Sequence, residues 1–299
     1  MKWNDPPLDS VITKNVYYYD ESKKATCQKI CNKLEIDCFP DLYDNKRFWI
    51  LDDNLWRSNK INYSVENITN PFDERLMDLF SINHSNIVFV SSSSLIDGII
   101  HFTNYENEDI FSCLYRNIHL FEKSLRSHLI SLNLNFEYLR IYFEKKRDES
   151  KRDSDIKYIE KILKRFKNNE FNENNPYQEL DFGDLLTFSF SSKHDKDIFN
   201  KIGITKLKGK VKIDDIVKLR NTIMHSKQVS GEKKNTLFEF PSFAIFFKQV
   251  LLLKLAFMSL SDAMTCNTLD KKRNENLIKL ELIDKMSDSE IKEYFYLNY

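Results

Sequence analysis

The spacing of apolar residues divides the chain into two parts. In the first hundred residues, short apolar runs alternate with segments of helical spacing, whereas from about residue 109 apolar residues recur every three or four positions over long stretches. One such series, which predicts a long core helix, comprises Leu114, Ile118, Phe121, Leu125, Leu129 and Leu132. The pattern predicts an α+β protein, with a smaller α/β module over residues 1–108 and an all-helical bundle over residues 109–299.

The N-terminal module contains one pattern twice. Each copy is predicted to be a helix followed by two strands, and the copies are offset by roughly 46–48 residues. The segments are TCQKICNKLEI, DCFPDLYD and KRFWILDD in the first copy, and PFDERLMDLFSI, NIVFVS and IDGIIHF in the second. Pro71 stands at the start of the second helix, where proline is favoured. The module therefore reads as an internal duplication.

This repeat, over residues of about 12–107, resembles a pair of cystathionine-β-synthase (CBS) motifs. The resemblance implies a regulatory or assembly module, with an adenine nucleotide as the candidate ligand between the copies. In the family a Thr or Ser and, three residues later, an Asp hold the ribose; here His101 and Asn104 take those places and are the candidate nucleotide-binding residues. Asn lacks the charge that strengthens a carboxylate contact. Trp49 stands where the first copy is expected to have Gly.

Composition and charge narrow the class of protein. Glycine and proline are scarce, with 5 and 6 residues, which argues against a disordered or collagen-like chain. Residues 1–110 contain 11 Lys and Arg against 18 Asp and Glu, whereas residues 201–235 contain ten basic and three acidic residues. A basic segment of this kind can bind a polyanion such as RNA. A solvated, lysine-rich surface accounts for the charge equally well.

The remaining composition predicts a cytoplasmic protein without a membrane partner. The opening MKWNDPPLDS is polar and lacks the features of a secretory signal. The most apolar stretch is interrupted by Glu239, Pro241, Lys248 and Lys254, so it is interpreted as a buried helix. The five cysteines follow no zinc-finger spacing and are predicted to be reduced thiols, so no metal site is expected.

The segment IDDIVKLRNTIMHSKQ is predicted to be a helix, with Asp214 or Asp215 at its N-terminus. At about 100° per residue, Arg220 falls within the apolar face of this helix. That face comprises Ile216, Val217, Leu219, Ile223 and Met224. An unpaired guanidinium there would cost about 3–5 kcal/mol, so Arg220 needs a carboxylate, a phosphate or an interface. Asn221 and His225 are four residues apart and point the same way.

Arg220, Asn221 and His225 match RNxxxH, a form of the signature of HEPN domains, which are all-helical, metal-independent ribonucleases of abortive-infection proteins, toxin–antitoxin toxins and type VI CRISPR effectors. LFEKSLRSHLISL, with Glu122 and Arg126, resembles a helix of abortive-infection proteins of the AbiD/AbiF kind. ELDFGDLLTFSFSSKHDKDIF resembles the stretch that follows it there. The resemblance covers residues of about 109–265 and implies a homodimer in which two motifs form one composite site.

The resemblance implies an endoribonuclease in which the RNA 2′-OH attacks the adjacent phosphorus. His225 would transfer protons and Arg220 would stabilise the charged phosphate. Asn221 would orient the histidine or contact the phosphate. Glu122 would hold Arg220, and Arg126 would add positive charge. No cofactor is implied for this reaction.

The implied setting is antiphage defence or toxin–antitoxin control, with RNA as substrate and an RNA or protein antitoxin as a candidate partner. The alternative is a catalytically inactive HEPN protein that binds RNA or a protein as a sensor or scaffold. RxxxxH also arises by chance in ordinary helices, so the motif is tested together with its helical context.

Overall fold

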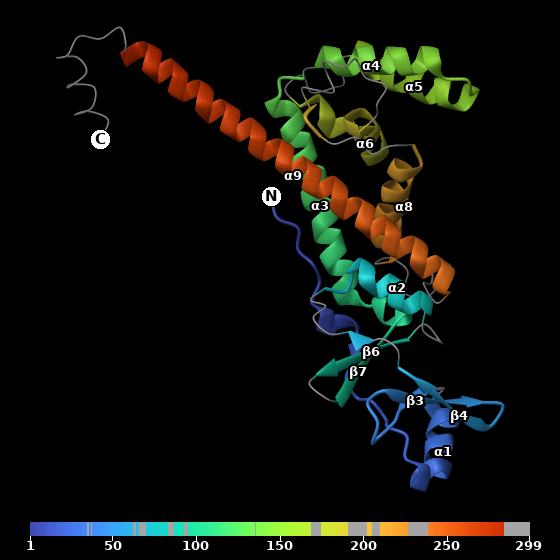
Figure 1. The fold of residues 1–299 in the computed structure, drawn as a ribbon. Coiled ribbons are helices and arrows are strands. Elements are labelled where there is room, and N and C mark those ends of the chain that lie inside the picture. Colours follow the sequence, from blue (N-terminus) through green and yellow to red (C-terminus); the bar gives the residue numbers. More distant parts are fainter. Residues whose placement is uncertain are drawn as a thin grey trace. The chain divides into compact units, whose positions relative to one another are not determined.

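A computed structural model describes residues 1–34, 36, 38–61, 64–65, 70–82, 87–92, 95–134, 136–168, 175–190, 202–204, 210–226 and 239–283. The described residues form a mixed α+β structure with two small sheets and a helical C-terminal region (Figure 1). The predicted α+β class is confirmed at this level.

The chain divides into two compact units. The sheet unit comprises Trp3–Leu120 and Asp215–Leu253. The helical unit comprises Met1–Lys2, Phe121–Asp214 and Lys254–Tyr299. Three helices, α3 (Glu108–Ser131), α8 (Lys210–Ser226) and α9 (Phe240–Ile283), contribute residues to both. The predicted domain boundary between residues 108 and 109 stays a prediction.

Both copies of the predicted helix–strand–strand repeat are present. They consist of α1 (Lys24–Leu34), β2 (Cys38–Pro40) and β3 (Arg47–Asp52), and of α2 (Glu74–Ile82), β6 (Ile87–Ser92) and β7 (Leu95–His101). In each copy the two strands pair antiparallel. A short parallel pairing also spans each helix: Tyr19 bridges Asp41 across α1, and β5 (Ser64–Val65) pairs with β6 across α2. Parallel pairs require a crossover connection, and in both copies a helix provides it. The two copies therefore share the way in which their elements are connected.

Three strands of the sheet unit, the two-residue strands β1 (Ile12–Thr13) and β5 and the longer β4 (Leu55–Lys60), were not predicted. β4 pairs antiparallel with β3 and completes the sheet β2-β3-β4. Asp53 and Asn54 form the two-residue turn, with φ of 47° and 61°, which is the left-handed geometry of a tight hairpin. Most residues of β4 are exposed, so the strand lacks the apolar alternation by which strands are predicted.

The second sheet has the order β1-β7-β6-β5, and its edge strand β1 (Ile12–Thr13) comes from the start of the chain. Ile12 pairs with Ile100 of β7. A Cβ atom at Gly98 would lie 2.5 Å from Cγ2 of Ile12. Glycine at this position therefore permits the close approach of β1.

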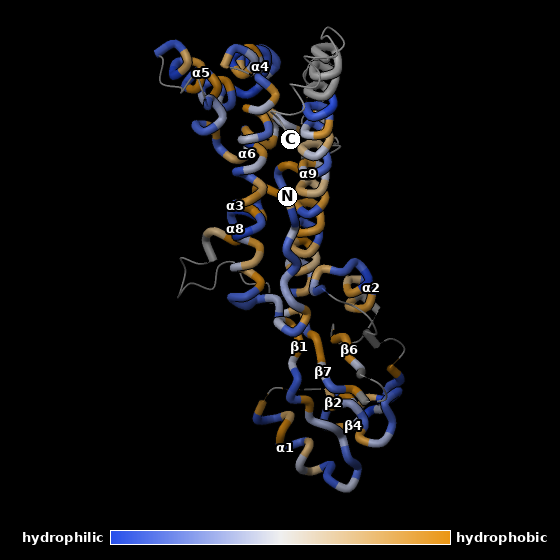
Figure 2. The backbone as a smooth tube through the Cα atoms, turned by 90° about the vertical axis from the view of Figure 1, so that its left-hand side faces the viewer, coloured by the Kyte–Doolittle hydropathy of each residue, from blue (hydrophilic) through white to orange (hydrophobic). Residues whose placement is uncertain are grey.

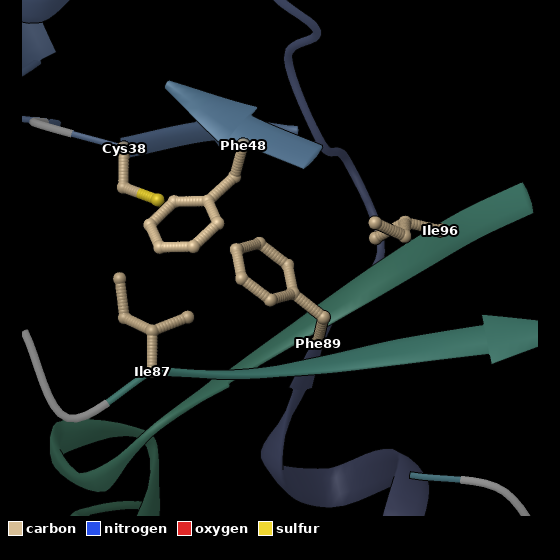
Figure 3. Packing of buried hydrophobic residues seen from close by; sticks show 5 residues of the cluster. All are labelled: Cys38, Phe48, Ile87, Phe89 and Ile96. Atoms are coloured by element: carbon tan, nitrogen blue, oxygen red, sulfur yellow. The ribbon is translucent and has the colours of Figure 1, made fainter. Parts of the chain in front are cut away.

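The two sheets bury a shared core. Phe48 of β3 and Phe89 of β6 lie in its middle, with ring centroids 5.2 Å apart. Figure 3 shows five side chains from the strands pointing toward one another: Cys38, Phe48, Ile87, Phe89 and Ile96. On the other face of β3, Trp49 packs with Tyr19, Cys27 and Phe39. Phe48 and Trp49 thus follow the two-residue period of a strand covered on both faces.

The apolar segment that was interpreted as a buried helix lies in α9. Its first turns pack against the rest of the sheet unit, with Phe243 and Tyr105 at a ring-centroid distance of 4.8 Å. The buried apolar residues of α9 are Phe243, Phe246, Phe247, Val250, Leu252, Leu253, Ala256, Phe257, Leu260 and Ala263. Figure 2 shows how apolar residues follow one another along this helix. By length and composition alone it could also cross a membrane, so the cytoplasmic location stays a prediction.

The helical unit is built around Phe121 of α3. Its ring lies 6.3 Å from those of Phe182 and Phe190 in α6 (Phe182–Phe190) and from that of Phe257 in α9. Two further helices of this unit, α4 (Phe136–Glu149) and α5 (Asp153–Lys167), lie side by side in Figures 1 and 2. A short 3-10 helix, η5 (Pro176–Glu179), precedes α6.

Candidate functional site

The predicted motif lies in the last turns of α8. Ile216, Leu219 and Ile223 are buried, whereas Arg220 is half-buried and Asn221 is exposed. The Arg220 guanidinium donates a hydrogen bond from Nη1 to Oδ1 of Asn221 at 3.3 Å. The backbone of His225 belongs to the same helix, and its side chain lies outside the described residues.

The predicted start of this helix was wrong. α8 begins at Lys210, one turn before Asp214 and Asp215. Ile213 is buried, so the apolar face of the helix continues before the two aspartates. Burial of this face stabilises the additional helical turn. Asp215 instead lies within 3.9 Å of Lys218 as an ion pair one turn apart.

Arg220 lies at the border of the apolar face rather than in its centre. Val217, three residues before it, and Met224, four residues after it, are half-buried as well. Residues at this spacing form one row along a helix. Val217, Arg220 and Met224 are named here the half-buried row. Two of its three members are apolar, so the row is a surface that further contact could cover.

Arg126 and Glu122 form an ion pair one turn apart on α3, and each is largely buried. The Arg126 guanidinium also donates to the carbonyl oxygens of Tyr177 and Leu180, at the two ends of η5. The Arg126 guanidinium therefore holds η5 against α3. Glu122 belongs to the helical unit and Arg220 to the sheet unit, so their predicted pairing stays a prediction.

His101 and Asn104 lie where β7 leads into α3. Nδ1 of His101 accepts hydrogen bonds from the hydroxyl and the amide of Thr103, at 2.6 and 3.3 Å. Nδ2 of Asn104 donates to the Val11 carbonyl at 2.8 Å and to Oγ1 of Thr13 at 3.1 Å. Both amide protons of Asn104 are thus engaged with β1 and its approach, which leaves only its oxygen for the predicted ribose contact.

A polar network in the helical unit was not predicted. Asp184 of α6 is buried and accepts from Nζ of Lys146 at 2.9 Å and from the hydroxyl of Tyr158 at 2.7 Å. Tyr158 also reaches Asp181 at 2.9 Å. Burial, followed by the hydrogen bond to Asp184, raises the pKa of Tyr158 well above its usual range. A lone aspartate within the apolar FGDLL was the signal, since a buried carboxylate requires partners.

Comparison with known proteins identifies no relative: no family model, no curated protein and no solved structure matches the chain. Within the described ranges, no group of three or more His, Cys, Asp and Glu side chains could hold a metal ion.

Proposed function

We propose that the protein is a metal-independent endoribonuclease of the HEPN type, with RNxxxH formed by Arg220, Asn221 and His225 on α8. The observation that carries the proposal is the half-buried row. Arg220 is held between two partly covered apolar residues, and its recorded hydrogen bond goes to the neighbouring motif residue Asn221. A cation placed in this way is available to a phosphate that approaches the helix.

The reaction needs proton transfer and charge stabilisation. The RNA 2′-OH loses its proton and attacks the adjacent phosphorus, the bond to the 5′-oxygen breaks, and that oxygen takes up a proton. The imidazole of His225 suits both transfers because its ordinary pKa lies near 6.5. The planar guanidinium of Arg220 suits the phosphate oxygens, whose negative charge grows in the transition state. The products are a 2′,3′-cyclic phosphate and a 5′-hydroxyl.

The composite site follows from the same row. If a second copy packs its α8 against the first, Val217 and Met224 become covered and the two Arg220–His225 pairs approach each other. A base and an acid are then present together. The proposed assembly is a homodimer, which sedimentation at micromolar concentration tests directly.

The central experiment measures cleavage of a labelled RNA by Arg220→Ala and His225→Ala variants. Each is expected to lose activity by about a hundredfold or more, since each removes one of the two chemical contributions. Lys218→Ala, on the same helix, and His119→Ala, an exposed histidine of α3, are the matched controls and should cut normally. Wild-type cleavage by folded His225→Ala protein would end the ribonuclease proposal. EDTA is expected to leave the activity unchanged.

The sheet unit is proposed to act as a CBS-like regulatory or assembly module. Its support is the duplicated unit in which a helix spans a parallel pairing and an antiparallel pair follows. An adenine nucleotide is expected to raise the melting temperature of the wild type. Asn104→Ala should lower the melting temperature of the protein without nucleotide, because the variant loses two hydrogen bonds to the N-terminal segment. The nucleotide should no longer raise the melting temperature of this variant.

An inactive HEPN protein is the second candidate, and the contacts of Arg126 favour it. That guanidinium is engaged with Glu122 and two main-chain carbonyls, so it serves the packing of α3 on η5. Expression in a bacterial host separates the two candidates. Growth arrest that requires His225 supports the ribonuclease, as would befit an antiphage or toxin–antitoxin role, whereas arrest that persists in His225→Ala supports a binding role.

A further inference from the structure

The exposed face of α5 carries a row of lysines. The opposite face is buried through Ile159, Ile162, Leu163 and Phe166. Lys157, Lys161 and Lys164 are exposed, and at about 100° per residue they lie within about 60° of one another, directly opposite the buried face. These three residues are named the lysine row.

The lysine row differs from four other cations of the same helix pair. Arg140, Lys146, Arg147 and Arg165 each form an ion pair with a carboxylate. In the part of the chain that the structure describes, none of the three lysines has a carboxylate within ion-pair distance. Three ammonium groups therefore lie along one line without an ion-pair partner among the described residues.

The acidic residues of α5 do not cancel the row. Asp153 and Asp155 lie in the first turn, where carboxylates complement the helix dipole. Glu160 lies beside the row and also acts on α4. The pKa of Arg147 is raised mainly by its hydrogen bond with Asp148, and the charge of Glu160 adds a smaller contribution. The positive charge thus remains along the outermost line of α5.

We propose that the lysine row binds the phosphate backbone of single-stranded RNA and holds the substrate of the ribonuclease, so this inference rests on the proposed function. From Lys157 to Lys164 the row extends about 10 Å at 1.5 Å per residue. A stacked strand advances about 3.4 Å per phosphate, so the row matches roughly three nucleotides. Lysines carry compact charges and contact phosphates without reading bases. The row would therefore supply affinity and leave sequence preference to other residues.

A membrane surface is the less favoured occupant. A helix that lies on a bilayer inserts an apolar face below its basic one. The apolar face of α5 is already buried in the protein, and the face that carries the lysines presents no large aliphatic residue. Phosphate contacts with a flexible strand need no insertion.

The test measures binding of a fluorescently labelled oligouridylate by anisotropy, in full-length protein that carries His225→Ala so that the label stays intact. The row variant is Lys157→Gln, Lys161→Gln and Lys164→Gln together. The control variant is Lys23→Gln, Lys29→Gln and Lys33→Gln, three exposed lysines at or within α1 with the same change in net charge. Circular dichroism and melting temperature confirm that both variants fold, as expected for surface changes.

At about 0.7 per single-strand phosphate, the loss of three contacts should reduce the slope of log affinity against log salt by about 2. The affinity at 0.1 M salt should fall by about a hundredfold, and the control variant should bind like its parent. Equal losses in both variants, no loss in the row variant, or no RNA binding at all would overturn the proposal. The proposal would also be overturned if the row variant lost binding to phosphatidylserine vesicles but kept its binding to RNA.

The inference and the proposed function can fail separately. If the row is needed for RNA binding but the wild-type protein never cuts RNA, the lysine row stands and the ribonuclease falls. If the wild-type protein cuts RNA and the row variant, with His225 restored, binds and cuts as the control does, the ribonuclease stands and the lysine row falls.

Discussion

Asn117 of α3 pairs with both main-chain groups of Asn4. Its Nδ2 donates to the Asn4 carbonyl at 2.7 Å, and its Oδ1 accepts from the Asn4 amide at 3.2 Å. The thiol of Cys113, one turn earlier, donates to the same carbonyl at 3.2 Å. The Asn117 side chain is only 1% exposed. The N-terminal segment is thus fastened to α3 through its backbone.

Asn117→Leu is expected to release this segment and to lower the free energy of unfolding by about 2 kcal/mol, since it leaves the two main-chain groups of Asn4 unpaired. Cys113 should then react with a thiol reagent as quickly as is expected of Cys266, which is exposed in the wild type. Asn4→Ala is the matched control and should change neither measurement, because Asn117 contacts the backbone. Slow Cys113 labelling in Asn117→Leu would contradict the prediction.

Asp184→Ala should lower the free energy of unfolding by about 3 kcal/mol, because it leaves Lys146 and Tyr158 without their buried acceptor. Asp181→Ala removes the exposed partner of the same tyrosine and should cost less than about 1 kcal/mol. Urea denaturation of the two variants gives both values. Similar losses would mean that burial of Asp184 does not set its contribution.

Acid should weaken the core around Trp49 through Asp41. Burial alone would raise the pKa of this carboxyl, but hydrogen bonds from the Trp49 indole and from the amides of Tyr43 and Asp44 lower it below its usual value. The unfolded chain therefore binds the proton more tightly, and stability is lost as the pH falls below about 3.9. Trp fluorescence during urea unfolding at several pH values should show this loss. Asp41→Asn should not show it, whereas Asp9→Asn should.

A second loss of stability is expected nearer neutral pH, and it arises from His128. Burial lowers the pKa of this imidazole, and the hydrogen bond to the Ile202 carbonyl opposes the shift. Because the folded pKa is the lower one, stability decreases as the pH falls through about 6.5, where the unfolded histidine takes up its proton. Comparing urea midpoints at pH 7.5 and 5.5 checks this. His128→Gln can still donate to the carbonyl and should be insensitive in that range.

Much of the fold was predictable because periodicity reports burial. Phe48 and Trp49 alternate between two covered faces, and Leu114, Phe121 and Leu129 mark one side of α3, so strand and helix were both readable. β4 was missed because its stability comes from pairing with β3 and from the turn at Asp53 and Asn54, neither of which leaves an apolar pattern.

The candidate site was less predictable. The pattern placed Arg220 on an apolar face, and its half-buried position agrees with the edge of that face. The contacts of Arg126 with the Tyr177 and Leu180 carbonyls join residues about fifty positions apart, and no local spacing encodes such a pairing. The lysines of α5 were visible as mixed charge, but which of them lacked partners depended on the neighbouring helix.

The edge strand β1 imposes an order on biosynthesis. Ile12 pairs with Ile100, and Asn4 is held by Asn117, so Asn4 and Ile12 are synthesised roughly a hundred residues before their partners. At about 5–20 residues per second, that interval is roughly 5–20 s. During it β1 has no strand to pair with, so a chaperone or a second nascent copy has access to its backbone in this period.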